Sequence, residues 1–285
     1  MKKIPIFILA DHNLDDDFSR KKIFELKIGD KLILQSLVEE IEKSDLFSEI
    51  YLIGNPIKLK KLFSLPIFTG QHDLKKNIKI IFDFSKAKFP NQLIAIITCD
   101  ILPKSEDFKR FFKKIEKKLE SSNLIFCFIL NSLLKVFREA DTLIKNDEEK
   151  PKNYNLVYNF FILRPDALNK KIIYFLIDLL RPLRKKRITN WSRFLLCFLK
   201  LIILIPKYPF VLFFLPKIFS VISLFKKYLK GNLKFSEIEK IVETIFIKRK
   251  NRKGKTCYLE VIDIPSFAED IDTEKDYEIL KKELQ

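Results

Sequence analysis

The sequence predicts an α/β fold in which a mainly parallel sheet lies between helices, a three-layer arrangement of the Rossmann type. Short apolar runs alternate with stretches whose apolar residues recur at helical spacing, which is typical of such a sheet. The continuous apolar run Leu93–Cys99 has the character of a strand covered on both faces. The 285 residues, 32% charged and 47% hydrophobic, are enough for a buried core and exclude a largely disordered chain.

The first half of the chain shows this alternation clearly. Apolar residues between 32 and 43 form the stripe of an amphipathic helix. Gly54-Asn55-Pro56 is a turn signal after a short apolar run. Ser105 is expected to cap a helix that has Asp107 in its first turn. The expected strands are 4–9, 50–54 and the run that ends at Asp100, and the expected helices are 32–43, 57–63, 74–84 and 105–119.

The second half continues the alternation after a break. Arg164-Pro165-Asp166 ends a strand-like run, and Thr273, with Asp276 three residues later, predicts the start of a final helix. The expected strands are 123–130, 155–163 and 258–264, and the expected helices are 235–246 and 274–284. We therefore expect one α/β domain from residues 1–175 and 255–285, with a helical basic and apolar insert at 176–254.

The basic charge of the chain is concentrated in that insert. Residues 179–236 contain thirteen Lys and Arg and no Asp or Glu, which accounts for all but +4 of the net charge of +17. This asymmetry bears on function rather than on fold.

Within the insert, Phe194–Ile205 and Phe210–Phe225 predict two short apolar helices. A helix of 12 residues spans about 18 Å, less than the ~30 Å hydrocarbon core of a bilayer. Flanked by basic residues, Trp191 and Tyr208, the two helices resemble an anchor at an anionic membrane surface. The alternative is a helical subdomain that packs on the sheet or on a second subunit. Nucleic acid is not an expected partner, because the segment is too apolar and has no recognised reader motif.

The cysteines and the N-terminus predict a cytoplasmic protein. The four cysteines have no CxxC or CxxH spacing, which favours reduced, buried thiols over disulfides or a metal site. The apolar run after Lys3 is too short for a signal sequence. The basic and apolar insert adds the expectation that the protein contacts the inner face of a membrane.

Two acidic segments follow predicted strands. Asp100 ends an apolar run, and Asp270 and Asp272 come shortly after the strand-like run 258–264. In open α/β sheets ligands bind at the carboxyl ends of strands, where two carboxylates can share one Mg²⁺ ion. The alternatives are that Asp100 caps the following turn, that Asp270 is a turn residue and that Thr273 only caps a helix.

Five stretches carry a resemblance to the MobA-like nucleoside-triphosphate transferases, which include molybdenum-cofactor guanylyltransferases and many sugar-phosphate nucleotidylyltransferases. Thr98–Pro103 resembles the family's D-x-P metal motif with one residue inserted, and Asp270–Tyr277 resembles its closing D-x-D-T-P-E-D-Y motif with Glu-Lys in place of Pro-Glu. The weaker matches are Ile6–Ala10, Lys22–Gly29 and Tyr158–Pro165. The resemblance covers residues 4–175 and 255–284.

The resemblance implies a nucleotide-diphospho-sugar transferase or GT-A-like fold and a Mg²⁺-dependent nucleotidyltransferase. The implied substrates are a nucleoside triphosphate and a phosphorylated or hydroxylated acceptor, for which the insert suggests a lipid-linked molecule. Asp100 and Asp272 are the implied metal ligands, and Lys22 and Asp100 the implied catalytic residues. The expected substrate-binding residues are Ala10, Arg20, Asn77 and Asn159.

Each of these residues has a plainer interpretation. Arg20 and Lys22 also fit a solvated basic run, Asn77 a helix surface, and Asn159 a satisfied buried amide. His12 and His72 lie on predicted loops without a ligand partner at useful spacing, so neither is assigned a role.

One departure from the family pattern leaves three functions open. The family follows its first strand with a glycine-rich loop that wraps the triphosphate, whereas residues 10–22 contain no glycine and have four aspartates in the seven residues 11–17. The alternatives to a nucleotidyltransferase are a non-catalytic membrane-surface binding protein on the same fold and a glycosyltransferase that uses nucleotide-sugars.

Overall fold

The computed structural model describes residues 2–11, 24–130, 132, 142–144, 152–184, 227, 233–252, 256–271 and 273–284. The chain forms two compact units. The first comprises residues 1–143, 152–167 and 253–285, and the second comprises 144–151 and 168–252. Most of the expected insert lies outside the described residues, including the two apolar helices expected at 194–205 and 210–225. The domain division at 176–254 therefore stays a prediction.

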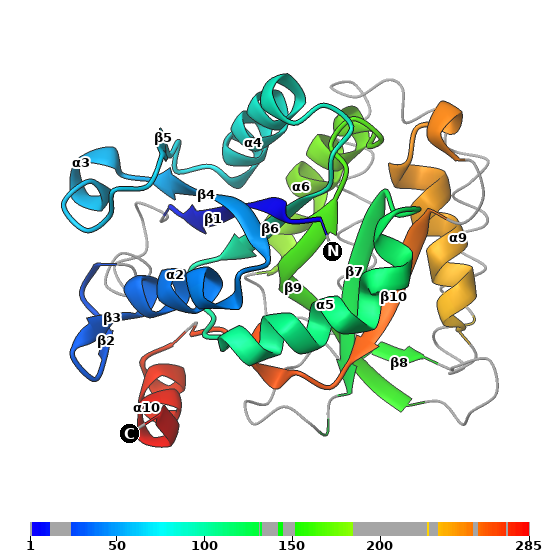
Figure 1. Cartoon of the computed structure of the whole chain (residues 1–285). Coiled ribbons are helices and arrows are strands. Elements are labelled where there is room, and N and C mark those ends of the chain that lie inside the picture. Colours follow the sequence, from blue (N-terminus) through cyan, green and yellow to red (C-terminus); the bar gives the residue numbers. More distant parts are fainter. Residues whose placement is uncertain are drawn as a thin grey trace. The chain divides into compact units, whose positions relative to one another are not determined.

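The first unit is built on a mixed, mostly parallel sheet (Figure 1). Its strands are β1 (Ile4–Ala10), β4 (Phe47–Gly54), β5 (Ile67–Thr69), β6 (Ile94–Thr98), β7 (Leu124–Leu130), β8 (Thr142–Ile144), β9 (Lys152–Leu163) and β10 (Cys257–Ile262). The order is β10-β7-β9-β6-β1-β4-β5, with β8 paired to β9. The pairs β1–β4, β1–β6, β4–β5 and β7–β10 are parallel, and β9 is antiparallel to both β6 and β7. The predicted α/β class with a mainly parallel sheet is confirmed.

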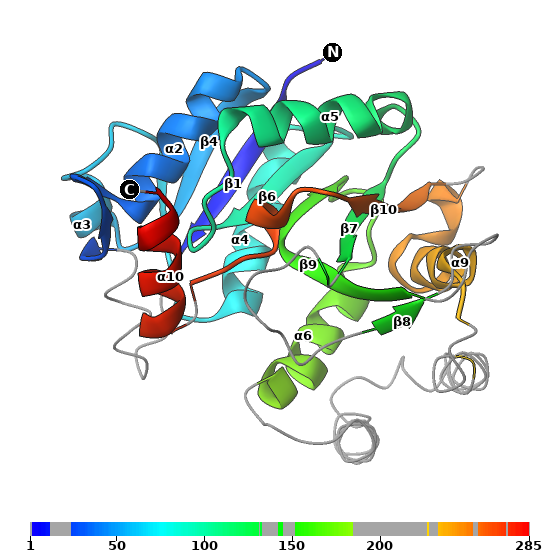
Figure 2. The ribbon, with the colours of Figure 1, turned by 90° about the horizontal axis from the view of Figure 1, so that it is seen from below.

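Two helices cover one face of this sheet. The helices α2 (Ile33–Ser44) and α5 (Ser105–Leu119) lie side by side there (Figures 1 and 2). Their apolar stripes bury Leu37 and Phe111 against Ile6, Ile8 and other residues that share this face of the sheet. The apolar residues of these helices, spaced three and four positions apart, therefore face the sheet, as their spacing predicts.

The helix α4 (Leu74–Lys88) covers the opposite face. Side chains alternate along a strand, so Phe7 points away from the face of Ile6 and Ile8. Phe7 stacks on Tyr51 with ring centroids 4.9 Å apart, and Phe84 of α4 packs edge-on against both rings. Aromatic pairs of this geometry add to the free energy that burial alone supplies.

The segment 253–285 completes the first unit. Its strand β10 extends the sheet beside β7, and the short 3₁₀ helix η4 (Pro265–Phe267) follows. The fully buried Phe267 stacks on Phe160 of β9 with centroids 4.9 Å apart. The helix α10 (Glu274–Leu284) lies near the small hairpin of β2 (Lys27–Ile28) and β3 (Lys31–Leu32), and the Tyr277 hydroxyl donates to the Lys27 carbonyl at 2.6 Å.

The helix caps match the sequence expectations in one of two cases. Thr273 caps α10 as predicted, because its Oγ1 accepts from the Asp276 N–H while the Asp276 carboxylate accepts from the Thr273 N–H. Ser105 was predicted to cap α5, and this is wrong, since the capping residue is Lys104. The reason is that the Asp107 carboxylate accepts the Lys104 N–H, and the Glu40 carboxylate takes the Ser105 N–H.

The described part of the second unit contains α6 (Lys170–Arg184), α9 (Phe235–Phe246) and the 3₁₀ helix η3 (Arg249–Asn251). The Asn169 N–H donates to the Phe246 carbonyl at 2.7 Å, and Leu168 and Ile247 form an isolated antiparallel bridge. Arg252 donates to the Thr244 and Ile247 carbonyls, which satisfies acceptors at the end of α9. Within the part of the chain that the structure describes, no helix has the length and apolarity to cross a bilayer.

Candidate functional site

The candidate site lies at the carboxyl edge of the parallel strands in the first unit. From β1 the chain continues to β4 on one side, and later returns to β6 on the other side. Such a switch point leaves a place where ligands bind in open α/β sheets. Ala10 pairs with Gly54 of β4, and Leu9 pairs with Thr98 of β6. Asp11 and Asp100 therefore follow two neighbouring strands at the same edge.

Asp11 is the centre of a buried polar network at this edge. Its side chain is 4% exposed. The carboxylate accepts the His72 backbone N–H at 2.6 Å and the Asn77 amide at 2.8 Å, both on Oδ2. Its Oδ1 lies 3.1 Å from Nδ1 of the His72 ring. His72 has a φ of 52°, in the left-handed region that few non-glycine residues adopt. The network thus holds the turn between β5 and α4 against the end of β1.

Asn77 uses both ends of its amide within this network. Its Nδ2 donates to Asp11, and its Oδ1 accepts the Gln71 N–H at 3.0 Å. The residue is buried, at 4% exposure. A buried amide satisfied in this way positions the chain around it. Substrate contact by Asn77 stays a prediction.

The two acidic segments meet through their backbones. The Ile271 N–H donates to the Asp100 carbonyl at 3.0 Å. Ile271 also packs in a small apolar cluster with Ile33 and Tyr277, against which Leu102 lies. Asp270 is buried, and its Oδ2 is shielded from solvent, as is Oδ1 of Asp100. The segment that precedes α10 is thereby fixed beside the residue that follows β6.

A second pair of polar side chains lies at the end of β6. Ile97 pairs with Phe160 in the antiparallel β6–β9 ladder, so the next residues, Thr98 and Asn159, stand opposite each other. Asn159 is 3% exposed. Among the described residues, neither its Nδ2 nor Oγ1 of Thr98 has a hydrogen-bond partner. Buried polar atoms without a partner are rare, and one explanation is an absent ligand or water.

The structure thus brings four of the predicted residues to one edge of the sheet. Ala10 ends β1, Asp100 follows β6, Asn159 lies opposite the end of β6, and Asn77 bonds to Asp11. Arg20, Lys22 and Asp272 lie outside the described residues. Over the described ranges, no group of three or more His, Cys, Asp and Glu is arranged to hold a metal ion.

The sequence assigned no role to Asp11, His72 or Thr98, and it left Asp270 open between a carboxylate at the sheet edge and a turn residue. The signal that singled out Asp100, an acid directly after a buried strand, applies equally to Asp11. His72 gave no usable signal, because its partner lies 61 positions away. The thiols of Cys99, Cys127 and Cys257 are buried and form no disulfide in the described part of the chain. Cys197 lies outside it.

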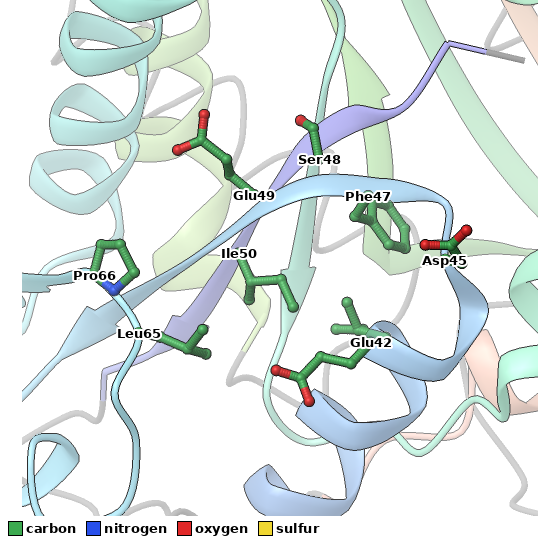
Figure 3. Close-up of a pocket in the computed structure, with 9 residues that line it drawn as sticks. Glu42, Asp45, Phe47, Ser48, Glu49, Ile50, Leu65 and Pro66 are labelled. Atoms are coloured by element: carbon green, nitrogen blue, oxygen red, sulfur yellow. The ribbon is translucent and has the colours of Figure 1, made fainter.

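A hollow elsewhere on the first unit is a poorer candidate. A pocket of about 400 Å³ lies between the end of α2 and the start of β4 (Figure 3). Glu42, Asp45 and Glu49 are among the residues that line it, with Ile50 and Leu65 as apolar walls. Phe47–Ile50 form the amino half of β4, whereas the switch point lies at its carboxyl end. The pocket is therefore separate from the polar network.

Comparison with solved structures identifies the class of fold. The chain is similar to a hypothetical transferase from Thermus thermophilus, with 14% identity, a TM-score of 0.61, and 97% of this chain and 100% of that chain covered. It is also similar to a 4-diphosphocytidyl-2C-methyl-D-erythritol synthase, with 10% identity, a TM-score of 0.50, and 100% of both chains covered. No model of a known protein family matches the sequence. A search of curated proteins finds no match either.

These likenesses show the fold. It is an α/β fold with a mostly parallel central sheet, as the sequence predicted, and the two solved proteins share it. Membership of the MobA-like family stays a prediction.

Proposed function

We propose that the protein is a Mg²⁺-dependent nucleotidyltransferase that moves a nucleoside monophosphate from a nucleoside triphosphate to a phosphorylated or hydroxylated acceptor. The observation that carries the proposal is the hydrogen bond from the Ile271 N–H to the Asp100 carbonyl. It joins the two acidic segments at the switch point of a fold shared with transferases. The synthase that shares this fold is named for a 4-diphosphocytidyl product, and this name also supports the proposal.

The residues at the edge suit a hard divalent ion. Carboxylate oxygens are the ligands that Mg²⁺ prefers, and Asp100 has a carboxylate oxygen shielded from solvent. Asp100 and Asp272 would hold the ion, and Asp270, buried beside Ile271, is a further oxygen donor. When bound, the ion supplies Lewis-acid stabilisation of charge on the phosphate oxygens.

The chain's own residues would bind and orient the two substrates. Lys22 and Arg20 would neutralise charge on the phosphates. Asn159, whose buried Nδ2 has no hydrogen-bond partner among the described residues, would donate to a substrate oxygen. Ala10 is fully buried, so it would contribute through its backbone. An acceptor oxygen would attack the α-phosphorus, the bond between that phosphorus and the bridging oxygen to the β-phosphorus would break, and pyrophosphate would leave with the electron pair.

The direct test is pyrophosphate release with Mg²⁺ and each of the four common nucleoside triphosphates. We expect Asp100→Asn to lower the rate at least ~100-fold, since the loss of even an outer-shell partner costs 10- to 100-fold at metal sites. Asp263→Asn, a change at an exposed carboxylate that pairs with Arg110, is the matched control and should leave the rate unchanged. Pyrophosphate release that survives Asp100→Asn at full rate would remove Asp100 from the mechanism.

Thermal shift separates the other two functions. The absence of glycine from residues 10–22 is the observation that favours them. Stabilisation by nucleotide-sugars but by no triphosphate would support a glycosyltransferase. Stabilisation by no nucleotide at all would support a non-catalytic binding protein.

We further propose that the acid-free segment 179–236 holds the protein at an anionic membrane surface on the cytoplasmic side. Its thirteen basic residues and apolar runs support this, because each basic residue near such a surface contributes on the order of 1 kcal/mol. A lipid-linked acceptor would then be within reach of the site.

A further inference from the structure

The Asp11–His72 pair is built like an oriented histidine at a binding site. The Asp11 side chain is 4% exposed and the His72 side chain 34% exposed, so the imidazole is the more exposed of the two side chains. Asp11 holds the turn of His72 twice, through the backbone N–H and through Nδ1 of the ring. A carboxylate at Nδ1 fixes the N–H there and sets the orientation of the second nitrogen, Nε2.

Several features of the chain serve this one contact. Gly70 leaves room for it, since a Cβ at that position would lie 2.5 Å from the Asp11 carboxyl carbon. Asn77 binds Asp11 from α4, and His72 accepts a left-handed φ of 52° to reach it. Backbone conformations of this kind cluster at ligand-binding sites, where the surrounding structure maintains them.

The helix that follows the turn begins with basic side chains. The helix α4 starts two residues after His72, and its first turn contains Lys75 and Lys76 and no acid. The acid at this helix N-terminus is the capping residue, Asp73. The Asp73 carboxylate is engaged with the Lys76 N–H.

We propose that His72, oriented by Asp11 and with both ring nitrogens protonated, donates a hydrogen bond from Nε2 to an anionic phosphate group of the nucleotide. The inference rests on the proposed function and deepens it, because it gives this chain a phosphate contact in the absence of a glycine-rich loop. Asp11 is then a positioning residue that acts through His72.

Two substitutions separate the ligand contact from the structural one. In His72→Gln the amide nitrogen can take the place of Nε2 while the contact to Asp11 is lost. In His72→Asn the amide nitrogen can take the place of Nδ1 beside Asp11 while the outer donor is lost, and Asn also tolerates a positive φ. A merely structural role predicts that binding follows stability, with His72→Asn close to wild type in both.

The experiment is calorimetric binding of each nucleoside triphosphate with Mg²⁺, and of tripolyphosphate, with melting temperatures measured in parallel. We expect His72→Asn to weaken binding about 10- to 100-fold, as for a lost charge-assisted hydrogen bond, with its melting temperature kept. His72→Gln should bind within about threefold of wild type, with a lower melting temperature. Adding Asp11→Asn to His72→Asn should weaken binding no further, because the two residues act as one unit.

The outcomes distinguish this inference from the proposed function. Triphosphate binding that is equal in wild type and His72→Asn overturns the inference and leaves the function standing. If the wild-type protein binds no triphosphate, the proposed function is wrong, and tripolyphosphate binding still tests the inference. Tripolyphosphate binding that is present in wild type and lost in His72→Asn supports the anion contact. Failure of the wild-type protein to bind tripolyphosphate overturns the inference.

Discussion

At the scale of single residues, two glycines determine how closely the strand ends and the β5–α4 turn can approach. A Cβ at Gly54 would lie 2.3 Å from the Ala10 carbonyl oxygen, which belongs to the backbone of β1. A Cβ at Gly70 would instead meet the Asp11 side chain, at 2.5 to 2.7 Å. Both positions need glycine for space, but only the second obstacle is a side chain that another substitution can remove.

This difference predicts the outcome of a double-mutant cycle. Gly54→Ala and Gly70→Ala should each destabilise the protein by about 1–3 kcal/mol, the range for overpacking. Asp11→Ser, which shortens the side chain, should recover part of the loss in Gly70→Ala and none in Gly54→Ala. Urea denaturation measures all the variants. Equal effects of Asp11→Ser on the two alanine variants would contradict the contact between Gly70 and Asp11.

A residue of the candidate site could be predicted from the sequence only where its immediate sequence neighbours give a signal. Asp100 has such a signal, because a buried apolar run ends there. Asn77 was named as a site residue, but its bonds to Asp11 and Gln71 depend on the fold of the turn and have no local signal. For Asn159 the sequence left two interpretations open, a ligand contact and a satisfied buried amide. Its Nδ2 has no hydrogen-bond partner among the described residues.

At the scale of elements, a charged cluster ties β4 to the end of α4. Lys88 donates to the Glu49 carboxylate and, at 2.6 Å, to the Tyr51 hydroxyl, which itself bonds to Glu49. The Lys88 ammonium also lies 5.3 Å from the ring centroids of Tyr51 and Phe89. The hydrogen bond from Lys88, followed by that from Tyr51, lowers the pKa of Glu49 from its ordinary value of 4.5.

The lowered pKa of Glu49 predicts a pH-dependent contribution to the free energy of unfolding. A carboxyl group with a lower pKa in the folded state stabilises the protein above the unfolded-state pKa, and this stabilisation is lost as pH falls through the folded-state value. Glu49→Gln should therefore be less stable than wild type at pH 7, and the difference should shrink below about pH 4.5 and vanish in stronger acid. Urea denaturation of both proteins between pH 3 and 7 measures it.

The control for this experiment lies on α4, the helix that contains Lys88. Asp83→Asn breaks an exposed pair with Lys79 one turn apart on α4 and should change the free energy of unfolding by at most about 0.5 kcal/mol. A difference between wild type and Glu49→Gln that is constant from pH 3 to 7 would contradict the role of the Glu49 charge.

Long elements were predicted well and short ones were missed. The helices Ser105–Leu119, Phe235–Phe246 and Glu274–Leu284 have the predicted bounds because their apolar residues repeat over three or more turns. The strand β5 has three residues and β2 and β3 two each, too few for any periodicity. No helix was expected over the range of α6, which includes the helix breaker Pro182.

At the scale of the whole molecule, charge is the most uneven property of the chain. The segment 179–236 is basic and free of acids, while the remaining residues are nearly balanced. Proteins with such a segment bind anionic surfaces at low ionic strength and lose much of that attraction as salt screens it.

The proposed membrane contact predicts flotation with vesicles. At low salt the protein should float with vesicles containing anionic lipids and stay unbound with neutral ones, and 0.5 M salt should weaken flotation, because ~0.5 M shortens the Debye length to a few Å. Replacing the basic cluster of residues 184–187 by alanine should reduce flotation. The matched control replaces the exposed Lys109, Lys113 and Lys117 of α5 by alanine and should float like wild type. Protein that stays unbound to anionic vesicles at low salt would exclude the contact.

The position of β10 has a consequence for how the chain matures on the ribosome. Residues 253–285 supply an outer strand of the sheet, the buried Phe267 and the Ile271 N–H that meets Asp100, and they are synthesised after the whole of 168–252. A nascent chain that has released only its first 250 residues therefore exposes one side of β7 and leaves the edge at Asp100 incomplete. The nascent protein can assemble that edge only once residues 253–285 have left the exit tunnel, so the order of synthesis delays completion of the candidate site.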